Sequence, residues 1–251
     1  MVTLLKKDRK DLILRQINVH SRVSFNDLAT MLNVSEDTIR RDLNELSSEQ
    51  KIVKVKGGAM AKGNEFLVEN QQNFAQESKI IIAKKAVKLL KDGMLVLVGG
   101  GTTVREFIAA IPENLKATFV TLNPYTCIHL MAKPNIDTIL VGGKVSNYSQ
   151  AVIGGDAFLK LREIKADLCV VGTNGIDPEN GLTDSHWETV EIKKALFLAS
   201  KKIMVLAISE KLNSTLNLKI CGMEEVDYLV SELDKDHESL EKYRYKNVIL
   251  I

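Results

Sequence analysis

The pattern of apolar and polar positions in the first 60 residues predicts three short helices followed by a strand. A first helix covers residues 8–18. A second runs from Phe25 to about Leu32 after Ser24, whose hydroxyl suits an N-cap, and Ser35 caps a third. The apolar side of this third helix has the spacing i, i+4, i+7 and is made by Ile39, Leu43 and Leu46.

The opposite side of the third helix is polar and carries two arginines. Two short helices joined by a tight turn, the second rich in arginine, indicate a helix-turn-helix over about residues 23–42. Such a helix can lie in a DNA major groove while its apolar side packs on its own domain. The candidate DNA contacts on it are Ser35, Thr38, Arg40, Arg41 and Asn44. The alternative is a solvated face, on which the arginines form ion pairs with Asp37, Asp42 or Glu45.

A short strand follows the third helix. Apolar residues alternate with lysines from Ile52 to Lys56, and Gly57-Gly58 come next. This alternation predicts a strand with one wet, basic face, which we interpret as the wing of a winged helix. Lys54 and Lys56 are then placed to contact DNA phosphates.

From about residue 78 the pattern changes to apolar runs of strand length separated by helical segments. The predicted strands are 94–98, 118–121, 138–141, 168–171, 203–207, 228–230 and 247–251. The predicted helices are 78–91, 103–111, 125–132, 156–164, 186–200 and 236–244. Apolar strands that alternate with helices imply a Rossmann-like parallel α/β sheet covered on both faces. We therefore predict a winged helix-turn-helix domain at 1–60, a linker at 61–77 and an α/β domain at 78–251.

The charge of the chain is unevenly distributed. Residues 1–62 hold 12 Lys and Arg against 8 Asp and Glu, whereas the remaining residues hold 22 against 24. A modestly basic N-terminal part on a near-neutral body suits a DNA-binding head better than a general nucleic-acid coat. Ordinary fluctuation in composition is the alternative.

The three cysteines, Cys127, Cys169 and Cys221, lie far apart and form no Cys-x-x-Cys pair. We interpret them as reduced residues, with Cys169 in a core strand, and expect neither a metal site nor a cofactor. No apolar run approaches the ~20 residues that cross a bilayer. Charged residues come too early at the N-terminus for a signal peptide. We expect a cytoplasmic protein with no membrane partner.

A glycine-rich loop follows the predicted strand 94–98. It reads Gly99-Gly100-Gly101-Thr102-Thr103 and leads into a helix. Glycines let backbone N–H groups turn toward a ligand, and the N-terminus of a helix favours an anion. The loop is neither a Walker A sequence nor Gly-x-Gly-x-x-Gly. It is a candidate phosphate site, although glycine-rich turns after strands are common.

Polar and glycine residues also follow four other predicted strands. We expect these residues to lie together at the carboxyl ends of the strands, where open α/β sheets bind ligands. The lysines suit a phosphate and the asparagines suit sugar hydroxyls. The candidates are Thr121, Asn123, Gly143, Lys144, Asn174, Gly175 and Lys211. The alternative is that the glycines only end strands and the lysines are solvated.

These residues together resemble the DeoR family of bacterial transcriptional regulators. The most specific match is Ser35-x-x-Thr-Ile-Arg-Arg-Asp-Leu43, with Lys56-Gly-Gly-Ala59 behind it. The resemblance implies a C-terminal sensor domain similar in fold to ribose-5-phosphate isomerase and CoA transferases. It also implies a repressor of sugar catabolism that binds operator DNA, responds to a phosphorylated sugar and acts as a dimer or tetramer. On this resemblance residues 78–251 bind the effector and oligomerise, and Glu188 joins the effector site.

The sequence departs from the usual family pattern at the expected ligand site. Gly99 and Gly100 stand where Asp and Ser are usual, Leu122 stands for Asn, and Ile208 stands for Asp. Carboxylates accept hydrogen bonds from sugar hydroxyls, so their loss favours a ligand richer in phosphate. Weak or absent effector binding is the competing hypothesis.

Two other functions are weighed against a DNA-binding repressor. An isomerase would need a positioned base and a polarising acid. The candidates Asp184, His186 and Glu188 lack a recognisable catalytic spacing, so we assign no catalytic residue. A DNA-binding adaptor with a ligand-free, oligomerising C-terminal domain is the other possibility, and the apolar strand 247–251 is then a candidate interface or sheet edge.

Overall fold

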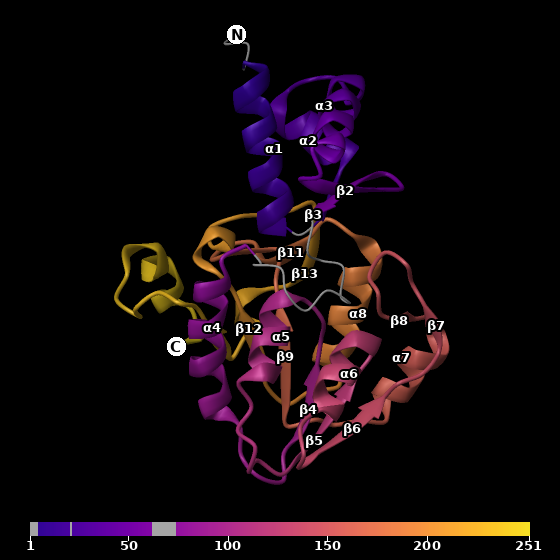
Figure 1. Cartoon of the computed structure of the whole chain (residues 1–251). Coiled ribbons are helices and arrows are strands. Elements are labelled where there is room, and N and C mark those ends of the chain that lie inside the picture. The colour runs from indigo at the N-terminus through magenta and orange to yellow at the C-terminus, as the bar shows by residue number, and fades with distance from the viewer. Residues whose placement is uncertain (1–4, 21, 62–73) are drawn as a thin grey trace. The chain divides into compact units, whose positions relative to one another are not determined.

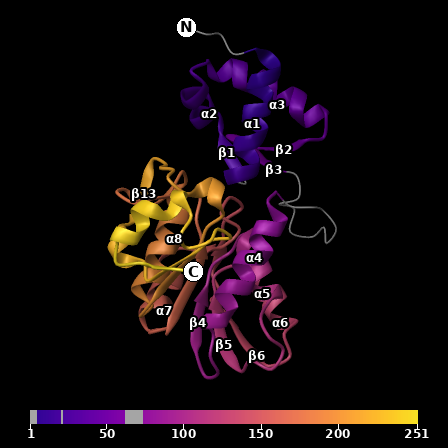
Figure 2. The ribbon, with the colours of Figure 1, turned by 90° about the vertical axis from the view of Figure 1, so that its left-hand side faces the viewer.

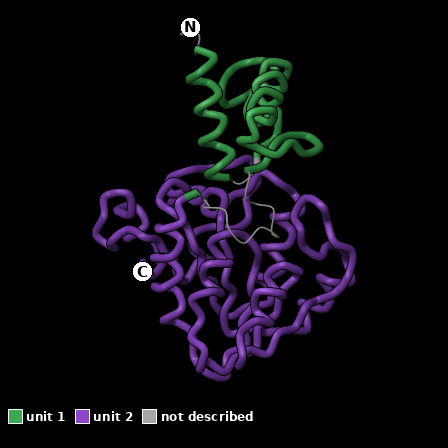
Figure 3. The backbone as a smooth tube through the Cα atoms, viewed as in Figure 1, with its two compact units in different colours: residues 1–74 green, residues 75–251 purple. Residues whose placement is uncertain are grey.

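A computed structural model of the chain describes residues 5–20, 22–61 and 74–251. The chain divides into two compact units, residues 1–74 and 75–251 (Figure 3). The predicted linker 61–77 lies mostly outside the described residues; at its ends, Ala61 belongs to a strand and residues 76 and 77 belong to a helix.

The first unit has three helices and a small antiparallel sheet of strand order β1-β3-β2 (Figure 1). Its elements are α1 (Lys6–His20), β1 (Arg22–Ser24), α2 (Phe25–Leu32), α3 (Glu36–Ser48), β2 (Ile52–Val55) and β3 (Gly58–Ala61). The three predicted helices are confirmed. The predicted wing has a second strand, β3, and β1 adds a third; neither was predicted.

Local chemistry explains where these elements begin and turn. The hydroxyls of Ser24 and Ser35 accept hydrogen bonds from the N–H groups of Asp27 and Thr38, so both predicted N-caps are confirmed. Asn33 ends α2 with φ of 52°, a left-handed conformation that asparagine tolerates. Only glycine fits at position 58, because a Cβ there would lie 2.0 Å from the carbonyl oxygen of Val23.

The second unit is built on a parallel sheet of strand order β15-β14-β12-β9-β4-β5-β6. The sheet strands are β4 (Leu95–Val98), β5 (Ala117–Thr121), β6 (Ile136–Leu140), β9 (Leu168–Gly172), β12 (Ile203–Leu206), β14 (Tyr228–Val230) and β15 (Ile249–Leu250). The predicted α/β class is confirmed. The last predicted strand is an edge of this sheet, as β15.

Helices cover both faces of the sheet. Figure 2 shows α4, α5 and α6 on one face and α7 and α8 on the other. Their bounds are α4 (Gln76–Ala86), α5 (Thr102–Ala109), α6 (Pro124–Met131), α7 (Gly155–Arg162) and α8 (Trp187–Leu198). Short 3₁₀ helices are η1 (Val87–Leu89), η2 (Ser209–Lys211), η3 (Met223–Glu225) and η4 (Glu238–Tyr245). The last of these replaces the predicted α-helix at 236–244.

The second unit also has two smaller antiparallel sheets, which the sequence did not predict. An antiparallel sheet of order β10-β11-β13 joins Gly175–Asp177, Gly181–Asp184 and Leu218–Cys221, and β7 (Lys144–Val145) pairs with β8 (Val152–Ile153). The three cysteines are buried and free of disulfide bonds. Cys169 lies in the core strand β9, as expected.

The strand order sets where a ligand can bind. From β4 the chain proceeds outward through β5 and β6, and then returns to place β9 on the other side of β4. The direction of progression therefore reverses between β4 and β9. In open parallel sheets, ligands bind outside the carboxyl ends of the strands at such a point.

Candidate nucleic-acid interface and anion site

Helix α3 presents its arginines outward because its opposite side is buried. Ile39, Leu43 and Leu46 are fully buried in the core of the first unit, as predicted. Arg40, Arg41 and Asn44 are exposed, and Thr38 is half-buried with its hydroxyl 3.0 Å from that of Ser35. The polar face is therefore free to approach a nucleic acid.

The two arginines have different surroundings. Arg40 pairs with Glu36 one turn earlier at 3.1 Å, and its guanidinium lies 4.1 Å from the centre of the Phe25 ring. Among the described residues the Arg41 side chain makes no hydrogen bond or ion pair. Within the described ranges neither arginine pairs with Asp37, Asp42 or Glu45, and the last two carboxylates bind residues of α1. The Arg40–Glu36 pair is nevertheless an exposed ion pair of the kind that the solvated-face alternative describes.

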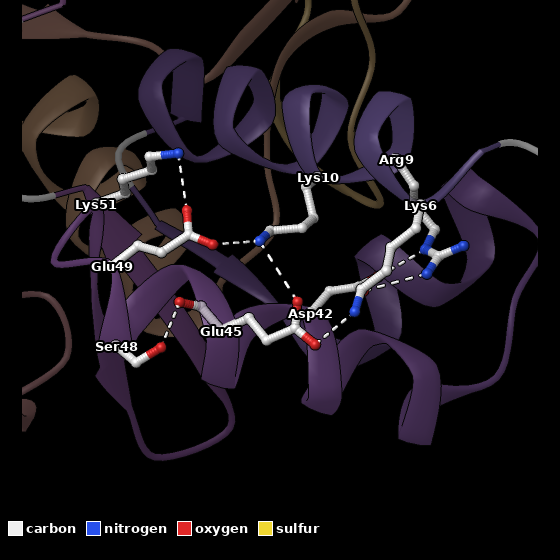
Figure 4. Close-up of polar contacts among 8 residues, drawn as sticks. All are labelled: Lys6, Arg9, Lys10, Asp42, Glu45, Ser48, Glu49 and Lys51. Carbon is white, nitrogen blue, oxygen red and sulfur yellow. Dashed lines mark hydrogen bonds and ion pairs between the residues drawn. The ribbon is translucent and has the colours of Figure 1, made fainter.

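A row of ion pairs joins α1 to α3 (Figure 4). The central pair is buried: Arg9 donates to both carboxylate oxygens of Asp42, at 2.6 and 3.1 Å, and Asp42 is 1% exposed. Around it, Lys6 pairs with Glu45, and Lys10 pairs with Glu45 and Glu49. Hydrogen bonds from Lys10 and Lys51 lower the pKa of the Glu49 carboxyl to about 2. These pairs fix the axis of α3 and use three cations of α1 within the fold.

The wing is linked to α3 by one hydrogen bond, from the ammonium of Lys54 on β2 to the side-chain oxygen of Asn44. Lys56 requires a correction, because it lies in the two-residue turn between β2 and β3 and not in the strand. Gly57 completes this turn with φ of 86°. Lys56 is exposed at the tip of the wing, where a phosphate contact needs no strand geometry.

In the second unit, the glycine loop ends at the N-terminus of α5. Gly101 is the N-cap, with φ of 112°, and no side chain caps the helix. Among the described residues, the hydroxyls of Thr102 and Thr103 have no hydrogen-bond partner. The loop is held by Gly99, whose N–H donates to Val170 and whose carbonyl accepts from Thr126, both at 3.0 Å. Free N–H groups, hydroxyl groups and a helix dipole together favour an anion.

Asn123, at the end of β5, faces this loop. Its side-chain oxygen caps α6 by accepting from the Thr126 N–H at 2.9 Å, which leaves Nδ2 pointing at Gly100. Asn123 is 4% exposed, and among the described residues Nδ2 has no acceptor. Thr121 requires a correction: it is fully buried, too deep for a ligand, and its hydroxyl accepts from the Asn123 N–H.

A second group of polar residues gathers where β9 and β12 end. The buried ammonium of Lys211 donates to the Thr173 carbonyl at 2.8 Å and lies 3.4 Å from the side-chain oxygen of Asn174. Burial lowers the pKa of Lys211 to about 7. The Lys211 ammonium is therefore hydrogen-bonded within the fold, although the residue as a whole is only half-buried. Asn174 in turn donates to Asp184 at 3.2 Å.

Asp184 is buried and fully engaged. One carboxylate oxygen accepts from the N–H groups of Ser185 and His186, and the other accepts from Asn174 and from the ammonium of Lys193 at 3.2 Å. The glycine at position 175 also has a structural explanation. It is buried in the small sheet, where a Cβ would lie 2.9 Å from the Thr183 hydroxyl.

Lys79 on α4 is a charged residue of this region that the sequence reasoning did not select as a site residue. It is 5% exposed, and burial lowers its pKa to about 8, with the nearby Arg105 charge acting in the same direction. The signal was available, because Lys79 shares one helix side with the apolar Ile82, Ala83 and Ala86.

Three further candidates make no hydrogen bond or ion pair with the glycine loop among the described residues. The Glu188 carboxylate accepts a hydrogen bond from Ser146, and beside it the ring of Tyr148 stacks on that of His186. Lys144 is exposed on β7, and among the described residues it bonds to no other predicted site residue. Gly143 is explained by its backbone, because a Cβ there would lie 2.8 Å from a methyl group of Val152.

In the described ranges no group of three or more His, Cys, Asp or Glu residues is arranged to hold a metal ion. Within the same ranges no helix is both long and apolar enough to cross a membrane.

A winged helix-turn-helix with an outward arginine face, in one chain with a parallel α/β unit, defines a helix-turn-helix transcriptional regulator. The family model for the DeoR-like helix-turn-helix domain matches residues 9–64, and that for the DeoR C-terminal sensor domain matches residues 74–233. The chain therefore belongs to the DeoR family.

Similar curated proteins include the transcriptional regulator GolR of Listeria innocua, which is 30% identical over 90% of both chains. The transcriptional repressor GlcR of Bacillus subtilis is 28% identical over 91% of this chain and 89% of its own. The L-fucose operon activator of Haemophilus influenzae is 26% identical over 94% and 95%. Among solved structures, ribose 5-phosphate isomerase A from Methanocaldococcus jannaschii matches 55% of this chain and 53% of its own, with 21% identity and a TM-score of 0.41.

Proposed function

We propose that this DeoR-family regulator represses carbohydrate genes by binding operator DNA through α3 and the wing, and that a phosphorylated sugar bound in the second unit relieves the repression. Arg40, Arg41, Thr38 and Asn44 contact bases or adjoining phosphates. Lys54 and Lys56 hold the DNA backbone.

The observation that carries the effector proposal is the uncapped N-terminus of α5. Its N–H groups, the two threonine hydroxyls and the Asn123 amide are all donors at or beside the start of α5, next to the strand reversal. A phosphate group has the acceptors and the negative charge that this arrangement stabilises. Repression, rather than activation, is the part of the proposal taken from relatives such as GlcR, which is named a transcriptional repressor.

An isomerase activity is less well supported. A proton-abstracting base needs a free carboxylate oxygen. Both oxygens of Asp184 already accept two hydrogen bonds each, so Asp184 offers none. Glu188 keeps one oxygen free of the bond from Ser146, but among the described residues no polarising acid is in hydrogen-bond contact with it. The relatives described above are regulators, which also favours a regulator over an enzyme.

We propose that the protein acts in the cytoplasm, the compartment that holds the DNA.

We also propose a homo-oligomer, because one winged helix contacts little DNA and paired half-sites raise affinity. The sheet offers two edges for self-association, β15 and β6. Ile249 at the first edge is 55% exposed, and Ile139 and Leu140 at the second are 46% and 41% exposed.

The test is a DNA-shift titration on the chain's own promoter region, with phosphorylated sugars added singly. A specific shift that one sugar phosphate abolishes is the expected result. A shift that no phosphorylated sugar changes would leave a DNA-binding protein with a ligand-free second unit. No shift at low ionic strength would reject the DNA-binding roles given to α3 and the wing.

A further inference from the structure

The second unit holds two separate sets of donors at the carboxyl ends of its strands. One is the cradle, which we define as the N–H groups of Gly100–Thr103, the Thr102 and Thr103 hydroxyls and the amide of Asn123. The other is the Lys211 ammonium at the end of β9. The cradle satisfies the needs of one phosphate, so the role of the second set is unexplained by a monophosphorylated ligand.

Lys211 has no negative partner among the described residues. Its two hydrogen-bond partners, the Thr173 carbonyl and the Asn174 side-chain oxygen, are both uncharged. A charge removed from water is costly unless it is paired. Position 208, three residues earlier, is a buried isoleucine, so no carboxylate is supplied from the end of β12 itself.

The carboxylates nearby do not compensate. Asp184 accepts four hydrogen bonds, one of them from Lys193, so its acceptor capacity is used. Glu210 is exposed beside Ser209. The charge of Lys79 lies close enough to Lys211 to repel it. Asp184 is therefore saturated, and among the described residues the Lys211 ammonium has neither a hydrogen bond nor an ion pair to a carboxylate. A sugar hydroxyl would gain no free acceptor from Asp184.

The strands that carry the two sets of donors are close together. Strands β12, β9 and β4 are consecutive in the sheet, and neighbouring strands lie about 4.8 Å apart. Lys211 follows β12 and its ammonium binds the Thr173 carbonyl after β9, while the cradle follows β4. The strand ends from which the two sets extend are thus about 5–10 Å apart, which is comparable with the length of one sugar.

We infer that the effector carries two anionic groups at opposite ends of a sugar, one bound in the cradle and the other bound by Lys211. This inference rests on the proposed function, since it names the class of ligand for the same site. A bisphosphorylated sugar has the required chemistry. The second anion supplies the negative charge that Ile208 and the engaged Asp184 do not.

The experiment is calorimetric titration of the full chain with fructose 1-phosphate, fructose 6-phosphate and fructose 1,6-bisphosphate. The expected result is that the bisphosphate binds at least tenfold more tightly than either monophosphate. A charge-assisted hydrogen bond to a buried group corresponds to about 10- to 100-fold in affinity. Lys211→Met should bring the bisphosphate to within about threefold of the monophosphates and leave those unchanged.

Two further variants make the result interpretable. Thr103→Val, in the cradle, should weaken all ligands alike. Lys91→Met is the matched control, because Lys91 is exposed and precedes β4. It therefore lies toward the amino ends of the strands, opposite to the carboxyl ends where the two sets of donors are found. If Lys211→Met fails to fold, as judged by circular dichroism, the affinities of the three ligands for the native chain still test whether the effector carries two anionic groups.

Equal affinity for mono- and bisphosphate would overturn the inference and leave the proposed function intact. The same conclusion follows if Lys211→Met weakens both classes equally, because a single phosphate would then bridge the two sets of donors. No heat with any of the three ligands, together with an operator complex insensitive to them, would count against the proposed effector response itself.

Discussion

The ion pair between Arg9 and Asp42 should be the main polar determinant of how α3 is held. Breaking a buried pair by removing one partner costs about 3–5 kcal/mol. The Arg9 side chain is 13% exposed, so we expect about 2–4 kcal/mol for Arg9→Met or Asp42→Leu. A unit of 74 residues has a free energy of unfolding of about 4–11 kcal/mol. Either substitution therefore removes a large part of the stability of the first unit.

A double-mutant cycle measures this pair directly. The double variant replaces two opposed charges by apolar groups, which is often close to neutral, so it should cost much less than the sum of the single changes. Urea unfolding followed by far-ultraviolet circular dichroism gives the four stabilities. All tyrosines and the single tryptophan lie in residues 75–251, so Trp187 fluorescence reports the second unit and should not shift.

Additive costs, or single-variant costs below about 1 kcal/mol, would refute the argument. Lys6→Met is the matched control, because the Lys6–Glu45 pair joins the same two helices but is exposed on both sides. It should change the unfolding midpoint little. A loss as large as that of Arg9→Met would show that the whole row of ion pairs, rather than its buried member, holds α3.

Three further predictions follow from the two sites. Arg41→Ala should weaken specific operator binding by about 1–3 kcal/mol if the side chain contacts a base pair, and an unchanged operator shift would refute that role. Lys56→Ala should weaken all DNA sequences alike and reduce the salt slope by about 1, as measured by binding at several ionic strengths. Because burial lowers the pKa of Lys211 to about 7, the ammonium is charged below pH 7 and loses its proton as the pH rises. The advantage of bisphosphate over monophosphate should therefore fall about tenfold between pH 7 and 8.5, a range in which phosphate groups remain ionised, and it should not vary with pH in Lys211→Met.

The elements that the sequence predicted are those with a repeating pattern. The helices of the first unit have apolar positions at regular spacing, and the seven parallel strands are apolar runs separated by helical segments. Ser24 and Ser35 mark the starts of two helices by a local hydrogen bond. The strands that the sequence missed, such as β1 and β3, have three or four residues each. Strands this short form because they pair with segments elsewhere in the chain. The spacing of apolar residues within the strand itself does not reveal such pairing.

The buried charged residues were missed for a different reason. Asp42 and Lys79 each occupy the apolar side of a helix, where a charged residue is stable only with a partner. The partner of Asp42 is Arg9, which lies 33 residues away in the sequence. The available signal was a charged residue within the apolar face of a helix. At both positions, a solvent-exposed charge does not account for this placement.

Positions 100 and 123 show why the departures from the family pattern must be judged together. A Cβ at residue 100 would lie 2.4 Å from Nδ2 of Asn123, so the glycine there and the asparagine depend on each other. The usual serine at position 100 would bring a hydroxyl, which both donates and accepts. Asn123 brings only donors, because its oxygen is used to cap α6. With Ile208 at the position where the family usually has Asp, and with Asp184 fully engaged, neither position offers a free acceptor beside these donors. This shortage of acceptors is the reason that we propose an acceptor-rich, doubly anionic sugar as the ligand.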